Sequence, residues 1–222
     1  MAHKLEELPL FPLNTVLFPY AALQLHIFED RYREMIRECV EFDRPFGIVL
    51  IRRGSETGGV VEPYMVGTAV RIVQVHNYDD GRMDLHVQGE RRFRIRELDE
   101  SRSFLVGKVE PVIELEIEES PRAEDLLYRA REEFEHLIQK LFARQELSIK
   151  VQFPNDPVVL SFTIANLLPM ENLEKQRLLE TTDTLERVEE LIPILQTQNL
   201  EIAAPSYYRV GSTELKEWQS PN

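Results

Sequence analysis

The spacing of apolar residues changes once along this 222-residue chain, near residue 118, and that change restricts the folds open to it. Before this point, short apolar runs with the alternating period of β-strands are separated by turn residues. After it, apolar residues recur every three or four positions, as they do on one face of a helix. The chain therefore predicts an α+β protein with a β-rich subdomain at 1–117, a helical subdomain at 118–200 and a polar tail at 201–222.

The first part predicts mostly sheet, with a single embedded helix. Asp79-Asp80-Gly81 is typical of a β-hairpin turn, and the Gly-rich segment 54–59 indicates a loop between two further strands. The helix is expected from Glu29 to Phe42, with a buried face made of Tyr32, Met35, Ile36, Cys39 and Val40. The predicted β-runs are 8–18, 46–51, 64–76, 82–87, 91–98 and 104–117.

The second part predicts four helices. Ser120 and Asp156 each precede a proline, which pairs a capping side chain with a residue suited to the first helical turn. A short helix is expected from about 171 to 180, and the carboxylate of Asp183 can cap the last one, with Glu186 reaching back. Pro169 ends the second helix, and a proline at 193 predicts a kink in the last.

A strongly apolar stretch, LPLFPLNTVLFPYAALQLHIF, begins at residue 8 and contains Pro9, Pro12 and Pro19. Proline has no backbone N–H to donate, so this stretch cannot be an uninterrupted central strand. We expect it to bend around the sheet and to leave apolar surface near the rim. That surface is either core packed against the helix or a place that receives another extended chain.

Composition excludes several classes of protein. A formal charge of −13 argues against nucleic acid as the main partner. The sequence has no apolar run of signal-peptide type and none long enough to span a membrane. The single cysteine, Cys39, cannot form an internal disulfide, which favours a reducing compartment such as the cytoplasm.

No catalytic, metal or cofactor motif is present in the sequence. The five histidines do not pair at ligand spacings; His76 and His86 could face each other across the hairpin, but a solvated polar pair is the commoner arrangement. Ser55 and Ser161 lie outside any GxSxG turn, and no GxxxxGK[ST] loop occurs. We therefore expect no catalytic residue, no metal and no cofactor.

One dense basic run, RRFRIRE, covers residues 91–97. As a strand it would direct Phe93 and Ile95 inward and place Arg92, Arg94 and Arg96 on the outer face. That stripe is either a grip for an acidic partner or, as we favour, a solvated face neutralised by the excess of acid in this protein.

Several segments resemble the N-terminal domain of the Lon ATP-dependent proteases and its shorter stand-alone bacterial relatives. They are LPLFPLNTVLFP, LHIFEDRYREMI, VGTAVRIVQV, GERRFRI and DPVVLSFTIANLLPM, in that order, within residues 8–198. The resemblance implies a β-rich subdomain with a partly closed, mainly antiparallel sheet and one embedded helix, followed by a helical bundle. It also implies a non-catalytic module that binds unfolded or flexible polypeptides. Tyr20 departs from the family pattern, in which glycine commonly follows Phe-Pro.

The resemblance directs attention to the entrance of the first helix. Its HIFEDRY match predicts a polypeptide-binding rim beside the proline-rich stretch, although acidic residues there also suit the positive end of a helix dipole. Alternative functions are a structural or regulatory subunit that self-associates or docks to a protease or chaperone, and, less favoured, a stand-alone peptidase. The predicted rim residues are Tyr20, Phe28, Glu29, Asp30, Arg31 and Tyr32.

Overall fold

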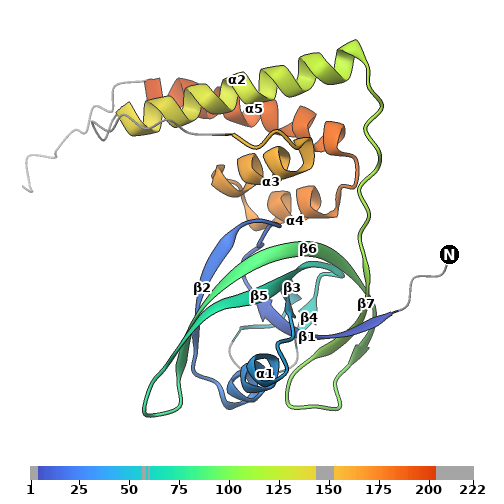
Figure 1. Ribbon diagram of the computed structural model, residues 1–222, viewed down its shortest axis with the longest axis vertical. Coiled ribbons are helices and arrows are strands. Elements are labelled where there is room, and N and C mark those ends of the chain that lie inside the picture. The colour runs from blue at the N-terminus through green and yellow to red at the C-terminus, as the bar shows by residue number, and fades with distance from the viewer. Residues whose placement is uncertain (1–4, 57–58, 60, 144–152, 204–222) are drawn as a thin grey trace, which may run out of the picture.

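A computed structural model describes residues 5–56, 59, 61–143 and 153–203. A β-rich part lies at one end and a layer of helices at the other (Figure 1). This confirms the predicted α+β class with a mostly antiparallel sheet. The strands are β1 (Glu6–Leu13), β2 (Ala22–Ile27), β3 (Phe46–Arg53), β4 (Glu62–Pro63), β5 (Val66–Asn77), β6 (Met83–Asp99) and β7 (Val106–Pro111), and the helices are α1 (Asp30–Glu41), α2 (Pro121–Ala143), α3 (Pro157–Leu167), α4 (Asn172–Glu180) and α5 (Thr184–Ala203).

Five of the strands close into a ring. Its order is β1-β7-β6-β5-β3, and a parallel pairing of β1 with β3 joins the two ends. Each strand alternates inward and outward side chains, so one set of apolar residues gathers inside the ring. This interior cluster consists of Leu8, Leu10, Val49, Ala69, Phe93, Ile95 and Val109.

β1 changes partner halfway along its length. Glu6 to Pro9 pair with β7, and Leu10 to Leu13 pair with β3. The strand is thus not paired along its whole length on both sides, as its prolines predict. Most of this stretch is core, the first of the two alternatives, because Leu8, Leu10, Phe11 and residues 16–18 are buried by closure of the ring and by the helices.

Two predicted strands, 82–87 and 91–98, form one long strand, β6. Its first half lies between β5 and β2, and its second half lies between β5 and β7. β2, β6 and β5 therefore extend beyond the ring as a three-stranded arm, visible at the lower left of Figure 1. Asp79-Asp80-Gly81 turns the chain from β5 into β6, with Gly81 at φ 85°, as the sequence predicts.

α1 packs against the arm. Tyr32, Met35, Ile36 and Cys39 are buried among apolar side chains of β2, β5 and β6. This confirms four of the five residues predicted for the buried face. Val40 is the exception: it is 49% exposed. It lies at the edge of this face, beside the part of β5 that no longer pairs with β3.

Burial controls the chemistry of the single cysteine. Desolvation raises the pKa of the Cys39 thiol to about 11, so at pH 8 it holds roughly a hundredfold less thiolate than an exposed cysteine. We expect alkylation by iodoacetamide at pH 8 to be at least about a hundredfold slower in the native protein than in urea. Mass spectrometry of timed samples measures both rates, and comparable rates would contradict this burial.

The helical layer has its own core. The apolar faces of α2, α3, α4 and α5 meet there, and Val16, Phe18, Leu50 and Val66 of the β-rich part join them. The predicted caps are present: Asp156 accepts from the N–H groups of Val158 and Val159, and Asp183 accepts from those of Leu185 and Glu186. No described helix combines the length and apolar character that a membrane span requires.

The segment that joins the two parts runs from residue 112 to 120, between β7 and α2. The boundary predicted near residue 118 falls within it. Leu115 donates its N–H to the carbonyl of Thr182 at 3.0 Å, so this connection runs against the helical layer. Most of the predicted tail, from residue 204 onward, lies outside the described residues.

Candidate functional site

The predicted rim residues do not form one surface. Tyr20 lies in the turn between β1 and β2, where its N–H donates to the carbonyl of Gly89 at 2.9 Å. Its φ of 67° lies in the left-handed region. This backbone conformation suits glycine, whereas it costs a tyrosine about 1–2 kcal/mol. Tyr20 lies near the junction with the helices. Partial burial there and the negative charges of Asp156 and Glu114 raise the pKa of its hydroxyl.

The other predicted residues surround the first turn of α1. Arg31 donates to the Glu29 carboxylate and to the carbonyl of Glu56, and its guanidinium lies 4.5 Å from the Tyr32 ring centroid. Tyr32 is buried against Phe11, so its ring contributes to the core. Arg31 is held by these contacts.

The remaining two predicted residues of this group face solvent. The Asp30 side chain is largely exposed and pairs with Arg33. Phe28 is 52% exposed, an unusual position for a phenylalanine. Phe28 is therefore the predicted apolar residue beside α1 that is available to a partner.

Phe28 belongs to a group of aromatic side chains around Asp84 on the arm, which we call the Asp84 cluster. The His26 ring lies 6.1 Å from Phe28, and the His76 ring lies edge-on 4.8 Å from Tyr78. Asp84 holds the cluster together, because it lies 2.5 Å from Nδ1 of His26 and accepts from the Tyr78 hydroxyl at 2.6 Å. His76 is opposite Asp84 in the strand register and not opposite His86.

Hydrogen bonds shift the pKa values of two groups in the cluster in opposite directions. The bond from Tyr78, followed by the contact with His26, lowers the pKa of Asp84, and the same bond raises the pKa of Tyr78. These shifts favour the ionised form of Asp84 and the neutral form of Tyr78. The cluster can stack its rings against apolar or aromatic groups and can hydrogen-bond to polar ones. Among the described residues, no group of three or more His, Cys, Asp or Glu side chains could hold a metal ion.

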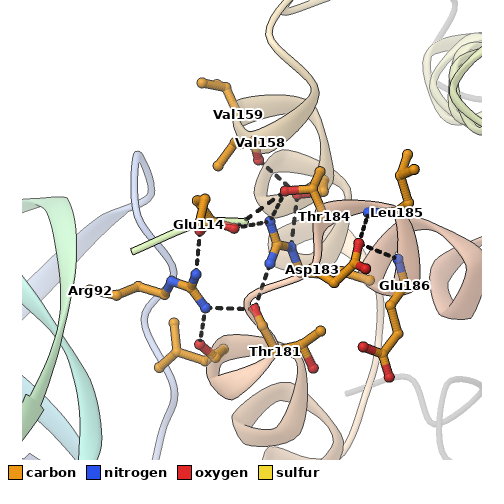
Figure 2. Close-up of polar contacts among 12 residues, drawn as sticks. Arg92, Glu114, Val158, Val159, Thr181, Asp183, Thr184, Leu185 and Glu186 are labelled. Carbon is orange, nitrogen blue, oxygen red and sulfur yellow. Dashed lines mark hydrogen bonds and ion pairs between the residues drawn. The ribbon is translucent and has the colours of Figure 1, made fainter. Parts of the chain in front are cut away.

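A second polar group lies between the two parts of the chain (Figure 2). Arg92 of β6 donates to the carbonyls of Leu179 and Thr181, at 2.6 and 2.7 Å, and to the Glu114 carboxylate. Arg187 of α5 donates to the same carboxylate at 3.1 Å and to the Thr181 carbonyl at 2.7 Å. We call Arg92, Glu114 and Arg187 the buried triad.

The triad carries two positive charges and one negative charge, and its Glu114 side chain is 25% exposed. The two guanidinium side chains are almost fully buried. Desolvation lowers the pKa of Arg92 to about 10 and also lowers that of Arg187, while Glu114 raises both. The carbonyls that end α4 supply further negative potential, as expected at a helix C-terminus.

Phe162 of α3 completes the junction. The guanidinium carbons of Arg187 and Arg92 lie 4.1 and 5.3 Å from its ring centroid, and the Phe18 ring lies 5.8 Å away. The ring attracts both guanidinium cations. This attraction partly replaces the contacts with water that the two cations lose on burial. The junction thus fixes the β-rich part against the helices.

The prediction that Arg92 faces solvent is wrong. Phe93 and Ile95 point inward as predicted, and Arg96 is exposed, but Arg92 is buried because the helical layer covers this part of the outer face of β6. Sequence reasoning also missed Tyr78 and Asp84. The hairpin turn that joins their strands was a usable signal, because it predicts that residues just before the turn lie near residues just after it, as Tyr78 lies near Asp84.

Comparison with solved structures identifies the class of domain. A Lon N-terminal domain protein from Xanthomonas campestris is 29% identical, with a TM-score of 0.61 over 85% of this chain and 98% of that chain. The N-terminal domain of Lon protease from the Mycobacterium avium complex has the same fold, with a TM-score of 0.65 at 22% identity over 86% of this chain and 98% of that one. The fold is that of Lon N-terminal domains.

The family follows from the sequence match. The model of the ATP-dependent protease La (LON) substrate-binding domain matches residues 7–197, and the chain belongs to this family. Relatives include Lon protease 2 of Myxococcus xanthus, 31% identical over 85% of this chain and 23% of that protein, and Lon protease of Escherichia coli K12, 28% identical over 86% and 25%. The chain thus spans about a quarter of the length of the relatives it matches.

Proposed function

We propose that this protein is a non-catalytic module that binds unfolded or flexible polypeptide. The observation that carries the proposal is the match of a substrate-binding domain family to residues 7–197. The exposed aromatic rings of the Asp84 cluster support it, because Phe28 and Tyr78 offer apolar area beside hydrogen-bonding groups. Aromatic residues of this kind supply much of the binding energy in protein interfaces.

Fluorescence anisotropy tests the proposal directly. The probe is labelled α-lactalbumin, either reduced and carboxymethylated so that it stays unfolded, or native with its disulfides intact. Saturable binding to the unfolded form and much weaker binding to the native form are expected. Equal, negligible binding of both forms would refute the proposal.

Variants of the Asp84 cluster test where binding occurs. Phe28→Ala and Tyr78→Ala are each expected to weaken binding about fivefold, the loss of roughly 1 kcal/mol of contact. Tyr128→Ala is the matched control, because Tyr128 on α2 is 60% exposed and donates to Glu132 at 2.7 Å, much as Tyr78 donates to Asp84. An equal loss in all three variants would show that the cluster is not the binding surface.

The non-catalytic part of the proposal has its own test. The protein is incubated with unfolded casein, with and without ATP and with and without a chelator. We expect the casein to remain intact in gel electrophoresis. Cleavage that follows the protein through successive purification steps would favour the peptidase alternative.

A further inference from the structure

The outer edge of β5 is only partly paired. Among the described residues, β3 pairs with β5 only as far as Val70, whereas residues 71–77 pair with β6 alone. The second half of β5 is therefore an edge strand of the arm. An edge strand offers N–H and C=O groups that an added strand can pair with.

The hairpin turn determines which groups point outward. Tyr78 donates its N–H to the carbonyl of Arg82 at 2.9 Å, so its backbone faces β6. Because backbone groups alternate in an antiparallel pair, His76 and Gln74 also face β6, while Val75 and Asn77 face away from it. These two residues leave two donors and two acceptors on the open edge.

A groove follows this edge as far as Val75. It has a volume of about 410 Å³ and lies between residues 71–75 of β5 and the end of α1 with the turn after it, residues 39–40 and 43–45. Its apolar surface includes Val40 and Val73, which are 49% and 55% exposed. Charges of both signs surround it, because Arg71 pairs with Glu90, and Asp43 and Arg44 lie at the opposite wall.

We propose that an extended segment of a bound polypeptide occupies this groove and adds to β5 as a further strand. This inference rests on the proposed function and specifies how the polypeptide is held. Backbone pairing with Val75 and Asn77 recognises any extended chain, and the groove favours segments with apolar side chains at alternate positions. A net charge of −13 favours neutral or basic segments over acidic ones.

The shape of the edge favours a foreign strand over a second copy of this protein. The register of β5 against β6 shifts between Ile72 and Gln74, which leaves Val73 as a bulge. A bulge bends an edge strand and hinders pairing between long flat edges. A short segment can still pair beyond the bulge, along Gln74–Asn77 of β5.

Two substitutions of Asn77 distinguish the contribution of its backbone N–H to binding from that of its side chain. Asn77→Pro removes one outward N–H, which takes no part in the β6 ladder, whereas Asn77→Ala keeps it. With carboxymethylated α-lactalbumin as the probe, we expect about fivefold or greater loss for Asn77→Pro and almost none for Asn77→Ala. Val73→Glu is expected to weaken binding similarly without altering the ladder, because Val73 is the exposed bulge residue.

Hydrogen exchange gives a readout that is independent of substitution. On binding the unfolded probe, the amides of Val75 and Asn77 are expected to exchange more slowly, whereas those of His76 remain as they are. The inference would be overturned if the wild-type protein binds the probe, exchange at both amides is unchanged, and all three variants bind with equal affinity. The proposed function would then still stand. Absence of wild-type binding would overturn both, and dimerisation abolished by Asn77→Pro would instead assign the edge to a second copy.

Discussion

Replacing Glu114 by glutamine is expected to lower the free energy of unfolding by about 3–5 kcal/mol. The change keeps the size of the side chain but removes the one negative charge of the buried triad. Arg92 and Arg187, both almost fully buried, would then face each other without a carboxylate between them. The cost is large because a buried charge that loses its partner cannot recover its hydration.

Urea denaturation followed by circular dichroism measures this effect. Glu189→Gln is the matched control, because it is the same substitution in the exposed pair with Arg122, and exposed pairs contribute roughly 0–1 kcal/mol. A loss for Glu114→Gln no larger than that of the control would show that the two buried arginines do not depend on the carboxylate. A variant too unstable to purify is consistent with the expectation, and Glu114→Asp, which retains the charge, would then be expected to fold.

Replacing Phe162 by alanine is expected to cost about 3–5 kcal/mol. This ring packs on Phe18 from the β-rich part and lies beneath both guanidinium groups of the triad. Its removal leaves a cavity and also takes away the aromatic face that stabilises the two cations. Phe162→Leu should cost less, because most of the volume is retained.

The matched control for this change is Leu167→Ala in the same helix. Leu167 is 53% exposed, and substitutions at exposed positions usually alter stability by about 0.5 kcal/mol or less. Both variants are compared in the same urea titration. Similar values for Phe162→Ala and Leu167→Ala would show that the junction does not depend on the aromatic ring.

Local patterns were sufficient to predict most individual elements. The helix of residues 30–41 follows from its apolar spacing, and the caps at Asp156 and Asp183 follow from short polar side chains placed before a helical run. The closure of the ring was not predictable from local patterns, because β1 finds one partner in β7 and another in β3. Such pairings depend on contacts between distant segments.

The same limit applies to the candidate sites. Alternation along β6 placed Phe93 inside correctly, but it assumed that water covers the opposite face, where Arg92 in fact meets the helices. The resemblance drew attention to Phe28, which lies in a recognisable motif and is 52% exposed. The partners that surround it, Tyr78 and Asp84, come from another hairpin, and the register that brings them together is a property of the sheet.

The double pairing of β1 has a consequence for biosynthesis. Leu8 pairs with Gly107, so a nascent chain cannot close the ring of strands until β7 has emerged from the ribosome. Until then, the inward-facing residues of β1 lack their final cover, and contacts between such distant positions form slowly. During translation this strand is therefore an exposed apolar segment of the kind that chaperones shield.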